Sequence, residues 1–208
     1  MKTTVKGLRF LFFFFFLLGC SDQDDAIVNH DPVCDVGNTT FQQMYSSLAV
    51  ASSSHELVTM DSEIHEYSFT LSSSKTICSI GYQSVHSDPA IPYIIEIENN
   101  DTNIVLYSGT HIFSQTATSY VAPTSTISLL PNVSYSIRRI QTNWDGDAYN
   151  VCGRLIESYD NLNTISVLPI SLNGMTVTGS KFSDVSDATN GPGDIDFILP
   201  YIDIVFEN

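Results

Sequence analysis

Alternation of apolar and polar residues is the feature that most constrains the fold of this chain. Every second residue from Tyr67 to Leu71 is large and apolar, and a similar period-two pattern returns from Cys78 to Tyr82. Because successive side chains of a β-strand point to opposite faces of a sheet, this period predicts strands with one buried face. Further runs rich in Tyr, Ile, Val, Thr and Phe, which strands favour, are expected at 93–98, 104–108, 112–121, 126–130, 133–142, 148–156, 165–170, 175–182 and 195–206.

Turn-forming sequences separate these runs at intervals of about 8–12 residues. Asn173-Gly174 is the strongest hairpin motif, and Asp145-Gly146 is expected at the tip of another hairpin. Asn99-Asn100-Asp101 and Pro131-Asn132 lie between pairs of runs, and Ser108-Gly109 is expected to open the next one. About ten short strands with no long helical segment between them predict an all-β fold and exclude a parallel α/β one. We expect an antiparallel β-sandwich of jelly-roll or immunoglobulin-like type.

One short helix is expected ahead of the strands. Phe41, Met44, Tyr45 and Leu48 have helical spacing, and Thr40 with Gln43 resembles a capping box. The small polar residues 49–54 predict a loop after this helix. We therefore expect a flexible acidic tether over residues 20–40 and the β-sandwich domain over residues 41–208.

The first 19 residues have the layout of a secretory signal peptide. Lys2, Lys6 and Arg9 precede nine apolar residues, from Phe10 to Leu18. A transmembrane helix needs about 20 apolar residues, so this run is too short to cross a membrane. We expect residues 1–19 to be removed, and the mature chain to keep five Lys and Arg residues against 23 Asp and Glu residues.

The end of the apolar run resembles the lipobox of bacterial lipoproteins. Its residues are Leu17-Leu18-Gly19-Cys20. The resemblance implies that Cys20 becomes the first residue and carries diacylglycerol and a further acyl chain such as palmitate, which together anchor a protein stably in a membrane. The following residues 21–25, Ser-Asp-Gln-Asp-Asp, are similar to the acidic stretch after the lipidated Cys in surface lipoproteins of the Bacteroidota. That similarity implies display on the cell surface from the outer membrane; an anchor facing the periplasm is the alternative.

A further resemblance covers most of the predicted domain. The stretches 67–71 and 75–82 are similar to a module that recurs in surface lipoproteins of flavobacteria, as are 131–139 and 200–206. The module has no assigned activity to transfer. The resemblance implies an all-β domain outside the cytoplasm.

Composition excludes two classes of protein. Of the 208 residues, 43 % are hydrophobic, which is too many for a disordered acidic chain. The formal net charge is −15, and an acidic surface repels phosphate backbones. We therefore expect a globular protein that does not bind nucleic acid.

Three cysteines remain beyond the lipobox: Cys34, Cys78 and Cys152. In an oxidising compartment they allow one disulfide in any of three pairings, with one thiol left over. Three buried, small apolar side chains are the alternative. No Cys-x-x-Cys occurs, so a zinc ribbon or a thioredoxin-like site is not expected.

No catalytic motif occurs in the sequence. His-Glu-x-x-His, Gly-x-Ser-x-Gly and a phosphate-binding glycine loop are all absent, so we expect neither an enzyme nor a cofactor. Two acidic clusters allow a structural calcium site or ordinary turns on an acidic surface. The first contains Asn143, Asp145, Asp147 and Asn150, and the second contains Asp184, Asp187, Asp194 and Asp196.

The single tryptophan, Trp144, gives the best candidate for ligand contact. It lies in a loop beside Asp145 and Asp147, where an indole ring can stack on a sugar and carboxylates can bind its hydroxyl groups. Packing of Trp144 over the sheet edge is the alternative. We therefore expect a lipid-anchored, surface-exposed module that binds a glycan or a surface protein. The alternatives are a structural or accessory subunit of an outer-membrane complex and an uncharacterised hydrolase.

Overall fold

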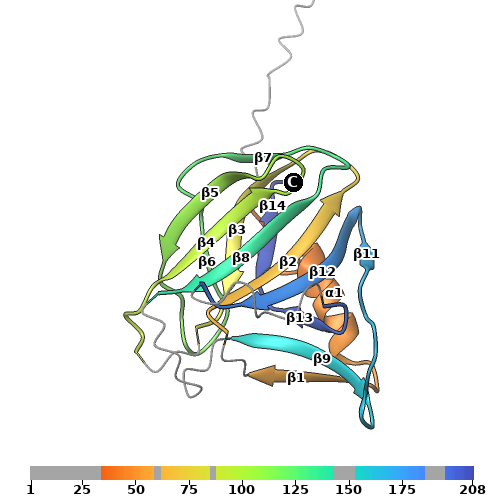
Figure 1. Ribbon diagram of the computed structural model, residues 1–208. Helices are drawn as coiled ribbons and strands as arrows, with labels where there is room; N and C mark the ends of the chain where they lie inside the picture. Colours follow the sequence, from red (N-terminus) through yellow and green to blue (C-terminus); the bar gives the residue numbers. More distant parts are fainter. Residues whose placement is uncertain (1–33, 59–61, 85–87, 143–152, 186–194) are drawn as a thin grey trace, which may run out of the picture. The chain divides into compact units, whose positions relative to one another are not determined.

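The computed structural model describes residues 34–58, 62–84, 88–142, 153–185 and 195–208. One helix and fourteen strands lie in these ranges (Figure 1). In chain order they are α1 (Thr40–Ala49), β1 (Ser54–Val58), β2 (Ile64–Leu71), β3 (Lys75–Tyr82), β4 (Tyr93–Asn99), β5 (Ile104–His111), β6 (Ser119–Val121), β7 (Ile127–Leu129), β8 (Tyr135–Gln141), β9 (Arg154–Asp160), β10 (Asn163–Thr164), β11 (Ile170–Leu172), β12 (Met175–Ser183), β13 (Ile198–Pro200) and β14 (Asp203–Phe206).

The strands form three antiparallel sheets. The largest has six strands in the order β11-β12-β2-β8-β4-β5. The second has the order β14-β3-β6, with β7 also paired to β3, and the third joins β1, β10 and β13 to β9. Figure 1 shows β3 and β14 behind the six-stranded sheet. The predicted all-β antiparallel sandwich is confirmed, with more strands than the ten expected.

One hydrophobic core joins the first two sheets. Burial alternates along the whole of β2, so Tyr67 and Phe69 point inward as the period-two pattern predicts. Ile95 of β4, Ile80 of β3 and Ile204 of β14 belong to the same buried cluster. Removal of this apolar surface from water is the main force that holds the two sheets together.

The predicted helix is confirmed, and it packs on the core at the edge of β14. Phe41 stacks on Tyr67, with ring centroids 5.1 Å apart, and lies edge-on to Tyr201 at 5.6 Å. The N-cap is Thr39 rather than Thr40, because the Thr39 hydroxyl accepts a hydrogen bond from the backbone N–H of Gln42 at 3.0 Å. Among the described residues no helix is long and apolar enough to cross a membrane.

The turn at Asn173-Gly174 is confirmed as a hairpin between β11 and β12. Both residues have positive φ values, 46° and 81°, which is the backbone conformation of a tight type I′ turn. The prediction that Ser108-Gly109 opens a strand is wrong, because both residues lie inside β5. Gly109 is needed there because the Tyr107 side chain lies over it and hydrogen-bonds to Nε2 of His111 at 2.7 Å.

Several of the predicted runs are shorter or divided in the structure, and of the run 165–170 only Ile170 lies in a strand. Within the run 112–121, only Ser119–Val121 is a strand. The run 195–206 contains two strands that join different sheets: β13 pairs with β9, and β14 pairs with β3. Pro200 ends β13, and proline has no backbone N–H to extend a ladder.

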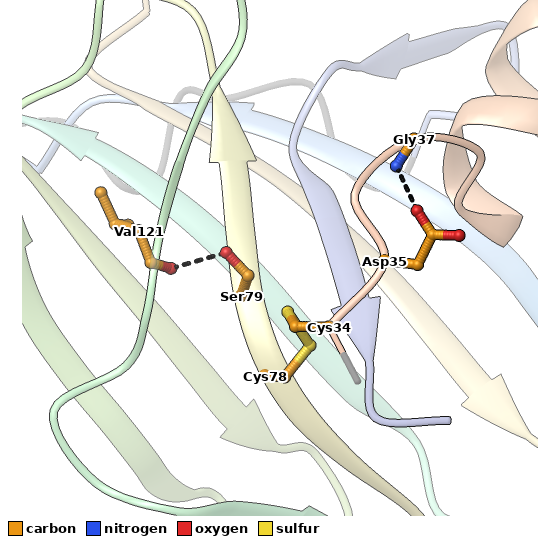
Figure 2. The surroundings of a disulfide bond; sticks show 6 residues. All are labelled: Cys34, Asp35, Gly37, Cys78, Ser79 and Val121. Carbon is orange, nitrogen blue, oxygen red and sulfur yellow. Dashed lines mark hydrogen bonds between the residues drawn. A yellow bond between two sulfur atoms is a disulfide. The ribbon is translucent and has the colours of Figure 1, made fainter. Parts of the chain in front are cut away.

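A disulfide joins Cys34 to Cys78 of β3, with 5.8 Å between the Cα atoms (Figure 2). It is one of the three pairings that the sequence allows, and Cys152 lies outside the described residues. The bond attaches the chain that precedes α1 to the central strand of the second sheet. It closes a loop with a sequence separation of 44 residues.

Replacing both cysteines, Cys34→Ser with Cys78→Ser, is expected to lower the free energy of unfolding by about 2–4 kcal/mol, because the open loop has more conformations in the unfolded chain. Urea unfolding with and without a reducing agent measures this. The wild-type protein should lose stability on reduction, whereas the double variant should be unaffected. Equal stability of the oxidised and reduced wild-type protein would contradict the prediction.

Candidate functional site

The residues predicted to contact a ligand, Trp144, Asp145 and Asp147, lie outside the described residues, as does Cys20. The chain enters the Trp144 segment after Gln141, the last residue of β8. The neighbouring residue of β8, Ile140, pairs with Ile64 at the beginning of β2. The predicted loop therefore departs from the end of the sandwich where β2 begins.

The second acidic cluster is described only at Asp184 and Asp196. Asp184 accepts a hydrogen bond from the backbone N–H of Glu63 at 2.8 Å, and Glu63 in turn accepts one from the backbone of Val185 at 2.7 Å. Asp184 thus fastens the end of β12 to the segment before β2. Within the described parts of the chain, no three His, Cys, Asp or Glu side chains are grouped to hold a metal ion.

A cavity of about 320 Å³ lies at the other end of β2. Four segments that are distant in the sequence surround it: the chain at and before the start of α1, the β2–β3 turn, the β11–β12 turn and β14. Its lining residues are Asp35, Asn38, Thr39, Thr40, Leu71, Ser73, Lys75, Asn173, Gly174, Met175, Ile204, Val205, Phe206 and Asn208.

The cavity is lined mainly by polar groups of several kinds, with a smaller apolar surface. Leu71, Met175 and Ile204 are buried members of the core, and they supply the apolar surface. Asp35 adds a carboxylate and Lys75 adds an ammonium group that forms no ion pair with any described residue. A concave site with many polar groups and some apolar surface can contact both the hydroxyl groups and the apolar parts of a small polar ligand.

The two turns at the rim of the cavity are fastened to each other. The backbone N–H of Ser72 donates a hydrogen bond to the carbonyl of Gly174 at 2.8 Å. A side chain at position 174 would collide with the Ser72 hydroxyl, and the positive φ of Gly174 also favours glycine. The backbone hydrogen bond and the turn conformation at Gly174 therefore hold the rim of the cavity in place.

A buried carboxylate lies behind the cavity wall at Asp203, the first residue of β14. It accepts hydrogen bonds from the Thr39 hydroxyl at 2.6 Å, the Gln42 amide at 2.9 Å and the Tyr120 hydroxyl at 2.9 Å. Burial raises the pKa of Asp203 above its ordinary value, and the three hydrogen bonds offset part of this rise. The network fixes the start of α1, where Thr39 and Thr40 line the cavity, to β14 and β6.

This cavity could not be predicted from the sequence. Its four segments are separated by long stretches of chain, and none of them contains a ligand-binding motif. Thr40, Leu71 and Asn173-Gly174 were singled out only as parts of a helix start, a strand and a turn. No model of a known protein family matches the chain, and no curated protein matches it.

Replacing Asp203 by Asn tests the burial of this charge. Because the pKa of Asp203 is raised in the folded protein, the folded state favours the protonated form. The resulting stabilisation is complete below about pH 3.8, the ordinary value, and is lost as the pH rises through the raised pKa. The unfolding free energy of the wild-type protein minus that of Asp203→Asn should therefore fall as the pH rises from about 4.

Urea unfolding of both proteins at a series of pH values measures this difference. Thr39→Val removes one of the three donors to the carboxylate, so it should make the loss with rising pH larger. Parallel pH profiles for the wild-type protein and Asp203→Asn would show that the carboxylate titrates as it does in the unfolded chain.

Proposed function

We propose that this chain is a lipid-anchored binding module, displayed on the cell surface from the outer membrane, and that it binds a glycan without catalysing a reaction. The cavity beside α1 is the observation that carries the proposal of binding. It is lined by Asp35, Asn38, Lys75 and Asn173, which offer donors and acceptors, above apolar core residues. Sugars present hydroxyl groups and apolar ring faces together, so they match such a lining.

The anchor is supported by the lipobox at Cys20 and by the acidic residues that follow it. Only thirteen residues separate Cys20 from Cys34, where the disulfide attaches the chain to β3. Fully extended, that stretch spans at most about 50 Å. A domain held this close to a bilayer suits a ligand at the cell surface.

Metabolic labelling with an alkyne analogue of palmitate tests the anchor. The wild-type chain should incorporate the label and fractionate with the outer membrane, and Cys20→Ala should do neither, because it lacks the thiol that receives the lipid. Cys152→Ala is the matched control and should be labelled as the wild-type protein is. Incorporation into Cys20→Ala would overturn the anchor.

Screening an array of oligosaccharides and polysaccharides tests the binding. We expect Lys75→Ala to weaken binding about tenfold, since a hydrogen bond from a charged group contributes about 1.5–3 kcal/mol. Lys181→Ala makes the same charge change on β12, away from the cavity, and should bind as the wild-type protein does. Trp144→Ala tests the loop predicted from the sequence in the same assay.

The results of this screen can also overturn the proposal. Loss of binding in Lys75→Ala alone assigns the ligand to the cavity, and loss in Trp144→Ala alone assigns it to the loop. A bound glycan that is insensitive to both substitutions would remove both sites. Absence of binding to every glycan on the array would reject a glycan as the ligand.

A role as a structural or accessory subunit of an outer-membrane complex is the second candidate. The observation that favours it is a set of exposed large apolar side chains along β5, the last strand of the six-stranded sheet. Such a surface indicates contact with another protein.

A further inference from the structure

One continuous stretch of the chain carries no charged side chain. Between Asp101 and Arg138 there are 36 residues without Asp, Glu, Lys or Arg, in a chain that contains 31 of these residues. The stretch contains all of β5, β6 and β7 and the connections between them. These three strands of a strongly acidic protein are thus built from residues without formal charge.

Most of the exposed large apolar side chains of this stretch lie at β5. This strand lies at the end of the six-stranded sheet and, among the described strands, pairs only with β4. Ile104, Val105 and Leu106 are 56 %, 45 % and 39 % exposed, and Ile112, directly after the strand, is 59 % exposed. Edge strands are usually protected by charged side chains, by proline or by a bulge, because their free backbone groups can pair with another strand.

The protection of β5 is limited to one irregularity. A register shift occurs opposite Ile97 and Glu98 of β4, where Leu106 is the extra residue on β5. Beyond it the pairing with β4 is regular from Tyr107 to His111. The edge over these five residues contains neither a charge nor a proline.

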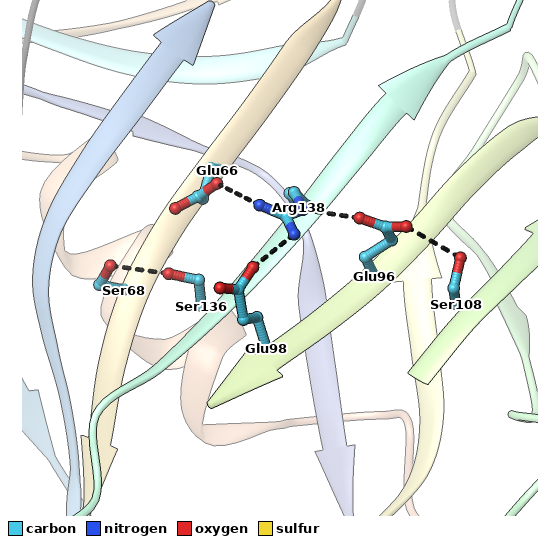
Figure 3. A network of polar contacts seen from close by, with 7 residues as sticks. All are labelled: Glu66, Ser68, Glu96, Glu98, Ser108, Ser136 and Arg138. Atoms are coloured by element: carbon cyan, nitrogen blue, oxygen red, sulfur yellow. Dashed lines mark hydrogen bonds and ion pairs between the residues drawn. The ribbon is translucent and has the colours of Figure 1, made fainter. Parts of the chain in front are cut away.

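Three carboxylates on the neighbouring strands share one cation, Arg138 of β8. Arg138 of β8 binds Glu96 at 2.8 Å and Glu98 at 2.5 Å, and Glu66 of β2 lies 3.6 Å from it (Figure 3). On the side of β5, the Ser108 hydroxyl donates a hydrogen bond to Glu96 at 2.9 Å. Glu98 is therefore paired with Arg138, and Glu96 is shared between Arg138 and Ser108 of β5.

We propose that β5 pairs with β5 of a second copy of this chain, antiparallel across a two-fold axis, so that two six-stranded sheets become one. A free strand edge needs a partner with backbone donors and acceptors, which another strand supplies and a lipid surface does not. A second copy carries the same excess of acidic residues, 23 against five once residues 1–19 are removed, and is repelled by the acidic surfaces. The uncharged edge is where two such molecules approach with the least repulsion, and an antiparallel pair of identical strands satisfies two-fold symmetry.

The mass of the full chain in mild detergent, measured by light scattering at protein concentrations up to about 100 μM, tests this association. The wild-type protein should be a dimer that tightens as the salt concentration rises, because salt screens the repulsion between two acidic molecules. Val105→Lys combined with Ile112→Lys should give a monomer at every salt concentration. Leu130→Lys adds a charge at an exposed residue of the same uncharged stretch, away from β5, and should remain a dimer.

Hydrogen exchange provides a second measurement that does not depend on these variants. Amides of β5 should be protected in the dimer and should exchange faster on dilution to the monomer. A wild-type monomer at the highest concentration would overturn the proposal, as would a dimer that persists in the double Lys variant. Binding of wild-type protein to phospholipid vesicles that is lost in the double Lys variant would assign the edge to a membrane and also overturn it.

Discussion

The buried carboxylate of Asp203 is the interaction on which the organisation of this domain depends. Burying an anion away from water is costly unless donors surround it, and here three donors come from two separate parts of the chain. Thr39 caps α1, Gln42 belongs to its first turn, and Tyr120 belongs to β6, while Asp203 itself opens β14. Each of these elements is short, so the shared carboxylate gives them a fixed arrangement that the cavity wall then uses.

The alternation in the sequence predicted the sheets because it reflects a simple repeating geometry. It located the buried face of β2, and Asn173-Gly174 located a hairpin through its backbone preference. The alternation could not predict that Arg139 of β8 points inward. Whether a charged side chain can be buried depends on the groups that surround it in the folded protein. The Arg139 guanidinium lies 5.5 Å from the centre of the Tyr93 ring and donates to the carbonyl of Glu63. The cavity could not be predicted for a related reason: its lining is assembled by tertiary contacts between segments that contain no ligand-binding motif.

The distribution of charge separates the regions proposed to meet different partners. Asp35 and Lys75 bring one charge of each sign to the cavity, which suits a ligand rich in hydroxyl groups. The outer face of the six-stranded sheet concentrates its carboxylates around Arg138. Beyond them, the edge at β5 has no formal charge at all. The net charge of −15 is therefore distributed unevenly over the molecule. The surfaces proposed for binding carry little of the excess of acidic side chains.

The disulfide at Cys34 determines how the domain bears mechanical load. A pull along the chain from its N-terminal side reaches a covalent bond to Cys78 before it reaches α1. The force passes into β3, which is held by β14 on one side and by β6 and β7 on the other. Several rows of hydrogen bonds would have to break together before the domain extended. The helix α1 thus lies outside the path of tension between the N-terminal side of the chain and β3.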